Sequence, residues 1–309
     1  ITCALRGLSG DFVTLAATAF LYGLVPPAIP MNVHKTCGVW FSGRHLGLAN
    51  GIVSAGMALG FLLGSLLSAT VLSPWLGGWR QVLFLYGALS VVVGVFWSFT
   101  REVPASERTP SREEKVPLRD GLPYVARIRN VWLLGLTMLG IGGCIQGTLG
   151  YLPLYLRRIG WPATFADIAM ATFHGVSLVA TIPMVMLSDR LGSRKGILMV
   201  GAVTTSAGVA LLSLSGGNLV WAAVIIAGVV RDGFMGVLMT LVLELERVGT
   251  KYGGTAIGMV LLFSRLGSLV SPPLGNSMAG FNLALPFIFW AALALIGLFC
   301  LYFVKEEES

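Results

Sequence analysis

The stretch "MLSDRLGSRKGILM", residues 186–199, is a short charged turn between two long apolar segments. The flanking segments cover residues 163–187 and 196–214, and each has close to the ~20 apolar residues that a helix needs to cross a bilayer core of ~30 Å. Within the turn, Gly192 is predicted to reverse the chain, and Asp189 to accept hydrogen bonds from the exposed N–H groups of a helix start. This pattern predicts two membrane-spanning helices joined by a tight loop.

The composition of the whole chain supports a membrane protein. Of the 309 residues, 55% are hydrophobic and 11% are charged, and the mean hydropathy is +0.82, whereas a soluble domain carries about 25% charged residues. We therefore expect an all-α, multi-pass protein in the lipid bilayer. Residues 1–9 form the tail of a further apolar segment, so we expect an N-terminal truncation. The segments long enough to span the bilayer are residues 11–32, 47–73, 80–100, 131–156, 163–187, 196–214, 218–242, 254–279 and 283–304.

Other classes of protein are disfavoured. The net charge of +7 comes from basic residues scattered through short loops rather than gathered on one face, so nucleic acid is not an expected partner. The four cysteines have no C-x-x-C spacing, and neither a metal site nor a cofactor is predicted. An enzyme or a receptor is a weaker alternative, because H-E-x-x-H and G-x-S-x-G motifs are lacking and the longest polar stretch covers only residues 101–121.

That polar stretch divides the chain. It holds ten charged residues and three prolines, a composition typical of a linker. We predict the remainder of one helix bundle at 1–100, a linker at 101–129 and a six-helix bundle at 130–309. If the linker faces the cytoplasm, its side of the membrane carries 15 of the 21 Lys and Arg and the other side carries three. This bias also places the C-terminus in the cytoplasm, and a prokaryotic cytoplasmic membrane is the expected location.

Two segments 207 residues apart are similar to each other. "GLANGIVSAGMALG" (47–60) and "GTAIGMVLLFSRLG" (254–267) share three glycines and one leucine in register. Chance similarity between glycine-rich helices is the alternative. Both segments, however, follow a predicted cytoplasmic loop, which favours the parallel repeat of a transporter built from two bundles.

The opening stretch resembles the loop motif of the major facilitator superfamily, G-x-L-A-D-R-x-G-R-K. Two positions depart from that motif, since Val185 replaces the leading glycine and Ser193 replaces the first basic residue. An ordinary basic loop on the cytoplasmic side of the membrane is the alternative. The positions that match are Asp189, Arg190, Gly192, Arg194 and Lys195.

The resemblance extends along the chain and implies a fold and a function. Compared with the family's twelve helices, the chain is similar to the end of the third helix and to helices four to twelve. It then implies an all-α fold of two bundles with a parallel pseudo-repeat. It also implies a monomeric secondary transporter, not an enzyme, that moves a small solute by alternating access. The 188–196 turn is expected to stabilise one closed state.

Five polar residues inside the predicted spans are candidates for the substrate site. At ~1.5 Å per residue, Arg231 lies ~18 Å from the outer end of its span, Arg265 ~16 Å from the inner end of its own, and His174 ~16 Å from the outer end of its own. All three therefore come near the midplane. A charge at this depth costs at least ~2.5–3.5 kcal/mol and usually faces a bundle interior or a water-filled cavity. The full set is Arg231, Arg265, His174, Asp232 and Gln146.

The charges in this set predict a small anion as the substrate. Two arginines face one carboxylate, Asp232, so one cation is left for a small organic or inorganic anion to neutralise. Because neighbouring residues of a helix point ~100° apart, we expect Arg231 to face the cavity and Asp232 to face a neighbouring helix. His174 is a candidate for proton coupling, and hence for symport. Gln146 is a candidate for orienting the substrate.

Structural roles are the alternatives for each of these residues. Asp232 and an arginine would then form a buried pair that only holds helices together. His174 would make an interior hydrogen bond, and Gln146 a contact between helices. In that case, the protein would transport or export neutral or apolar compounds.

Overall fold

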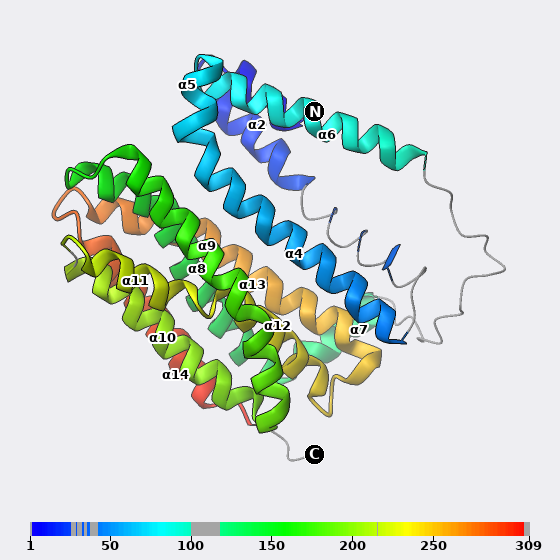
Figure 1. Cartoon of the computed structure of the whole chain (residues 1–309). Helices are drawn as coiled ribbons and strands as arrows, with labels where there is room; N and C mark the ends of the chain where they lie inside the picture. The colour runs from blue at the N-terminus through cyan, green and yellow to red at the C-terminus, as the bar shows by residue number, and fades with distance from the viewer. Residues whose placement is uncertain are drawn as a thin grey trace. The chain divides into compact units, whose positions relative to one another are not determined.

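The structure is a computed structural model of the whole chain (Figure 1). It describes residues 2–25, 43–99, 118–214 and 216–305, together with residues 29, 33, 36 and 37. All regular elements within these residues are helices, and they form two compact units, Ile1–Ser111 and Arg112–Ser309. Most of the predicted linker, residues 101–117, lies outside the described residues.

The first unit mixes short and long helices. Its elements are α1 (Thr2–Leu5), η1 (Arg6–Leu8), α2 (Phe12–Leu24), α4 (Gly43–Leu67), η2 (Ser68–Leu72), α5 (Ser73–Leu76) and α6 (Trp79–Ser98). Asp11 begins α2, because its carboxylate accepts a hydrogen bond from the Thr14 N–H at 2.8 Å and the Thr14 hydroxyl accepts one from the Asp11 N–H at 3.3 Å. Gly77 ends α5 with a φ of +86°, which glycine adopts without strain.

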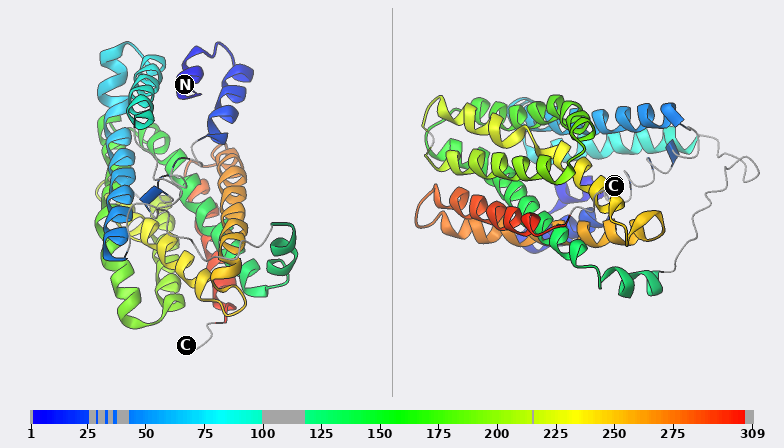
Figure 2. Two further views of the ribbon diagram at one scale, coloured as in Figure 1. Left: turned by 90° about the vertical axis from the view of Figure 1, so that its right-hand side faces the viewer. Right: turned by 90° about the horizontal axis from the view of Figure 1, so that it is seen from below.

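The second unit is a bundle of long helices. Its elements are α7 (Leu118–Val125), α8 (Arg129–Arg158), α9 (Ala163–Leu191), α10 (Arg194–Leu214), α11 (Leu219–Gly228), α12 (Arg231–Glu244), α13 (Gly249–Met278) and α14 (Leu285–Tyr302). Figures 1 and 2 show α8 to α14 side by side. The short α7 packs against α13, where the rings of Tyr124 and Tyr252 stack with their centroids 4.3 Å apart.

The spans predicted from apolar length are present as helices. Within the described residues, eight helices are long and apolar enough to cross a membrane. The predicted span at 11–32 corresponds to α2, a shorter apolar helix, and residues 26–28 and 30–32 of that span lie outside the described part of the chain. The prediction of an all-α membrane protein is therefore confirmed.

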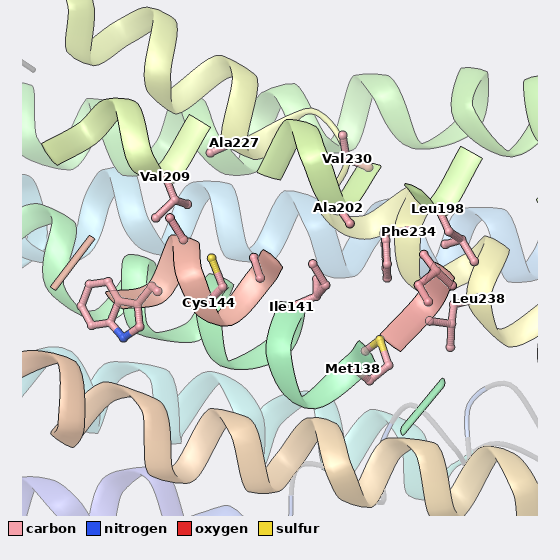
Figure 3. Packing of buried hydrophobic residues seen from close by; sticks show 14 of the residues in the cluster. Met138, Ile141, Cys144, Leu198, Ala202, Val209, Ala227, Val230, Phe234 and Leu238 are labelled. Carbon is pink, nitrogen blue, oxygen red and sulfur yellow. The ribbon is translucent and has the colours of Figure 1, made fainter. Parts of the chain in front are cut away.

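Small residues let the helices of the second unit approach closely. A Cβ atom added at Gly140 of α8 would lie 2.5 Å from the Leu293 carbonyl oxygen of α14. One added at Gly228 of α11 would lie 2.7 Å from the Phe173 carbonyl oxygen of α9. Figure 3 shows apolar side chains from α8, α10 and α12 meeting in one core. Because lipid is as apolar as leucine, such close packing, rather than the hydrophobic effect, holds membrane helices together.

The span predicted at 218–242 is interrupted at its centre. Gly228 ends α11 and Arg231 begins α12, and the two valines between them, Val229 and Val230, form a turn. The backbone of Val230 has φ −100° and ψ −13°, away from regular helix values. The interruption frees backbone N–H groups at a depth where water cannot satisfy them, so they need partners within the protein.

Candidate functional site

The candidate site forms where α9 packs against the start of α12. His174 and Ser177 are three residues apart on α9 and so share one face of that helix. Both are buried, with exposed fractions of 5% and 0%. Because Gly228 has no side chain, α11 passes against the backbone of Phe173. This close approach brings the first turn of α12 to the face that carries His174 and Ser177.

Arg231 contacts His174 directly. The Arg231 Nη1 atom lies 2.8 Å from the His174 Nδ1 atom. A guanidinium only donates hydrogen bonds, so the Arg231 N–H donates and the His174 Nδ1 accepts. The imidazole is therefore neutral, with its own proton on Nε2. This contact places the two residues at one level of the bundle, and their depth in a bilayer stays a prediction.

Asp232 is held by Ser177 through two hydrogen bonds. The Ser177 hydroxyl donates to the Asp232 Oδ2 at 2.8 Å, and the Asp232 N–H donates to the Ser177 Oγ at 3.1 Å. The second bond satisfies one of the backbone N–H groups that the interrupted span leaves without a helical acceptor. Ser177 therefore fixes both the side chain and the backbone of Asp232.

The arrangement of Arg231 and Asp232 differs from the expectation that they face different ways. Both contact α9, and the Arg231 Nη1 lies 3.5 Å from the Asp232 Oδ1. The Arg231 side chain is the more covered of the two, with an exposed fraction of 18% against 37% for Asp232. Neighbouring residues leave the helix axis ~100° apart at their Cβ atoms. The arginine side chain is long enough to bend back, so its guanidinium lies on the same side as Asp232.

The charges of this cluster balance. Arg231 is a cation, Asp232 is an anion and His174 is neutral, so the net charge is zero. Asp232 also lies in the first turn of α12, where the partial positive charge of a helix start stabilises a carboxylate by roughly 0.3–1 kcal/mol. Side-chain hydrogen bonds between membrane helices contribute ~0.6 kcal/mol on average and at most ~1.7. The cluster is thus a satisfied polar network in an apolar span.

Arg265 and Gln146 lie outside this cluster. Arg265 is exposed on α13, and Gln146 is exposed on α8. Within the part of the chain that the structure describes, neither forms an ion pair or a hydrogen bond with another side chain. The structure therefore brings together three of the five predicted residues, Arg231, Asp232 and His174.

The loop between α9 and α10 contains the charged motif. Gly192 has a φ of +64° and ends α9, as predicted for the turn. The helix α9 extends past Asp189 to Leu191, and Arg190 is exposed. The side chain of Asp189 lies outside the described part of the structure, so its role at a helix start stays a prediction. At the start of α10, the Ser193 hydroxyl accepts a hydrogen bond from the Gly196 N–H at 3.2 Å and caps the helix.

Two basic residues of this loop are tied to other helices. Arg194 forms an ion pair with Glu244 at the end of α12, with Nη2 3.0 Å from Oε1, and it donates to the Ser188 hydroxyl at 3.3 Å. Lys195 donates to the Val304 carbonyl oxygen, just after α14, at 2.6 Å. The loop thereby links the ends of α9, α10, α12 and α14.

Ser177 and Glu244 were not predicted from the sequence. The available signal for Ser177 was its position three residues after His174, on the same helix face. That signal is weak, because serine hydroxyls in helices often bond to their own backbone, as Ser268 does to the Ser264 carbonyl oxygen at 2.9 Å. Glu244 ends the span that contains Asp232, and its partner became evident only from the packing of α12 against α10.

The sequence matches one protein family along its whole length. The model of the Major Facilitator Superfamily matches residues 1–242 and, in an overlapping second match, residues 157–309. The chain is 28% identical over 296 residues to the "Probable nitrate/nitrite antiporter NarK1" of Thermus thermophilus. That match covers 86% of this chain, which spans 65% of the length of the relative.

Solved structures of transporters share the fold. A bacterial homologue of the human lysosomal transporter Spinster, inward-facing and occupied, matches with a TM-score of 0.69 and 17% identity, covering 98% of this chain and 78% of that one. The transporter FucP in its outward conformation matches with a TM-score of 0.58 and 15% identity, covering 99% of this chain and 80% of that one. At these identities the likeness concerns the fold. Together with the family match and the apolar helices, it makes the chain an integral, multi-pass membrane protein that belongs to the Major Facilitator Superfamily.

Proposed function

We propose that this protein is a secondary active transporter rather than an enzyme, and that it moves a small organic or inorganic anion by alternating access. The observation that carries the proposal is the charge balance of Arg231, Asp232 and Arg265. Asp232 lies 3.5 Å from Arg231, whereas Arg265 pairs with no carboxylate among the described residues. A cation within a span is costly unless it meets an anion or water, and a substrate anion would supply that partner.

The face of α13 that carries Arg265 supports a role in solute passage. At 100° per residue, Gly254, Gly258 and Asn276 lie within about 20° of Arg265, and Leu269 lies about 40° away; all of them are exposed. The face is therefore mixed. Open space surrounds the two glycines, which leaves room for water or a polar solute beside the guanidinium.

The chemistry of arginine and the name of one relative both support an oxyanion. A guanidinium holds a carboxylate or a planar oxyanion through two parallel N–H bonds. The relative from Thermus thermophilus is named as a probable nitrate/nitrite antiporter. That name favours small oxyanions as substrates, and it makes exchange of anions a candidate mode of transport beside import. Gln146, exposed on α8, would add one donor and one acceptor to the same site.

The proposal includes a membrane topology. The bundles at 1–100 and 130–309 are joined by a cytoplasmic linker at 101–129, and the C-terminus lies on the same side, as the excess of Lys and Arg in those loops supports. The 188–196 turn stabilises one closed state through the Arg194–Glu244 pair. The protein acts as a monomer in a prokaryotic cytoplasmic membrane.

A transporter of neutral or apolar compounds is the second candidate. The observation that favours it is the closed network of His174, Arg231, Asp232 and Ser177, in which each charge already has a partner within the protein. In that case Arg231 and Asp232 hold α9 and α12 together, and the solute makes no contact with them.

Anion uptake by proteoliposomes distinguishes the two candidates. The complete protein is reconstituted, and entry of labelled nitrate is measured for the wild type and for Arg265→Ala, Arg231→Ala and Arg119→Ala. Arg119 is exposed on α7 and controls for the loss of one positive charge. We expect Arg119→Ala to keep wild-type uptake and Arg265→Ala to lose at least about tenfold, the effect of ~1.4 kcal/mol in binding.

The two outcomes are distinct. If Arg265→Ala and Arg231→Ala both keep wild-type uptake of nitrate, the arginines do not bind the substrate and the anion proposal is wrong. If the wild type takes up neither nitrate nor a monocarboxylate such as formate, while a neutral solute enters, the second candidate replaces the first.

A further inference from the structure

The Arg231–His174 hydrogen bond can exist only while His174 is neutral. Nδ1 uses its lone pair to accept from the Arg231 N–H across 2.8 Å. A proton added to Nδ1 would point a second donor at the first, and the two positive groups would repel each other. Protonation of His174 and its contact with Arg231 are therefore mutually exclusive.

The surroundings of His174 contain few other groups that titrate or carry charge. Among the described residues, Arg231, whose Nη1 lies 2.8 Å from Nδ1, and Asp232 beside Arg231 are charged groups of this cluster. The helix α8 reaches α9 through the Arg157–Asp167 pair, but Asp167 lies seven residues before His174, or about 10 Å along the helix. The helix α11 has no ionisable side chain, and α10 has them only in its first turn. The contact between His174 and Arg231 thus depends on one proton, that of the imidazole Nδ1.

We propose that His174 is the proton-binding group of the transport cycle and that its protonation releases Arg231 to bind the anion. This inference rests on the proposed function. The proton comes from water and adds to Nδ1, while Nε2 keeps its own. The Arg231 N–H···Nδ1 bond breaks, and the guanidinium turns to the substrate. When the anion leaves on the other side, the proton returns to water and the bond forms again.

The ratio of protons to anions follows from the link between His174 and Arg231. Each anion that binds Arg231 requires one proton on His174, whereas Arg265 keeps the same charge in both states. One proton and one monovalent anion together carry no net charge. The protein would therefore carry one proton with each anion, without moving net charge. Exchange of one anion for another would leave the proton on His174 throughout the cycle. The same site would therefore allow both proton-coupled uptake and anion exchange.

His174→Asn is the variant that isolates this step. The asparagine Oδ1 occupies nearly the position of the histidine Nδ1, so it accepts the Arg231 N–H, but it does not bind a proton at any pH of the assay. Thr172→Val on the same helix is the control, because within the described part of the chain the Thr172 hydroxyl bonds the Ile168 carbonyl oxygen of its own helix, at 2.9 Å. Nitrate uptake is measured in proteoliposomes of the complete protein between pH 5 and 8, with a pH-sensitive dye inside.

We expect the apparent affinity of the wild type for nitrate to fall about tenfold per pH unit at high pH, because one proton is taken up on binding. One proton should enter with each nitrate, and an imposed membrane potential should leave the rate unchanged. In His174→Asn the side-chain amide keeps Arg231 bound at every pH, so nitrate uptake and nitrate–nitrate exchange should both fall at least about tenfold, the effect of ~1.4 kcal/mol in binding, and neither should depend on pH or bring protons in. Thr172→Val should behave as the wild type.

The inference is overturned if His174→Asn retains the pH dependence and proton entry of the wild type. It is also overturned if wild-type uptake of nitrate does not change with pH, in which case the proposed function stands and the protein is an exchanger. A wild type that transports no anion at any pH would overturn the proposed function and this inference together, so the two failures are distinguishable.

Discussion

Replacing Ser177 by alanine should loosen the junction between α9 and α12 by a measurable amount. The variant loses the hydrogen bond to the Asp232 Oδ2 at 2.8 Å and the one from the Asp232 N–H at 3.1 Å. Side-chain hydrogen bonds between membrane helices contribute ~0.6 kcal/mol on average and at most ~1.7. The bond to a carboxylate belongs at the upper end of that range, so the sum is about 2 kcal/mol.

Thermal unfolding in detergent measures this loss. For a bundle of this size, 2 kcal/mol corresponds to a lowering of Tm by about 4–8 °C. Ser213→Ala is the matched control, because the Ser213 hydroxyl bonds the Ala210 carbonyl oxygen within its own helix, and its Tm should change by less than about 1 °C. Ser177→Ala and Asp232→Asn should also be non-additive, since they remove the same bond. If Ser177→Ala lowers Tm no more than Ser213→Ala, Ser177 does not hold Asp232 and the description of the junction is wrong.

Other substitutions test the packing and the loop. Gly208→Ala puts a Cβ against the backbone of Ala227 and should destabilise by about 1–3 kcal/mol, whereas Gly216→Ala, with open space around it, should leave Tm in detergent unchanged; equal Tm values would contradict the close approach of α10 and α11. Ser193→Ala should cost about 1 kcal/mol through the lost cap of α10, and amide hydrogen exchange in the first turn of that helix should rise if this is correct. Arg194→Ala removes a partly exposed ion pair, so it should lower the free energy of unfolding by less than about 1 kcal/mol. It should still change the balance between inward- and outward-facing states, which cysteine accessibility measures. If that balance is unchanged, the loop has no part in the mechanism.

The extent of the helices was predictable, because the bilayer imposes a length and an apolar composition on each span. Because each span crosses the bilayer, the rise per residue also gives the depth of a residue within its span. His174 and Arg231, on different helices, were therefore expected at one level, and they are in contact. Gly192 was predictable for a local reason, since the end of a helix commonly needs a left-handed residue.

The interruption at Val229 and Val230 was not predictable in the same way. No proline marks it, and valine is compatible with a helix inside a membrane, so the local sequence contains no signal for a turn. The interruption depends on tertiary contacts, in particular on Ser177, which offers the Asp232 N–H an acceptor outside its own helix. Such a partner lies 55 residues away in the sequence.

The cap of α10 was not predictable from the motif. Ser193 forms it, at a position that is only a departure from the family motif. The pairing of Arg194 with Glu244 likewise depends on how α10 meets α12.

The interrupted span has a consequence for how motion is distributed in the second unit. A continuous helix transmits a tilt from one end to the other, whereas α11 and α12 meet at a joint that hydrogen bonds from Ser177 and His174 tie to α9. When these hydrogen bonds break, α11 and α12 can tilt independently of each other. Deuterium uptake at the amides of 229–232 would then report how often the joint opens during the transport cycle.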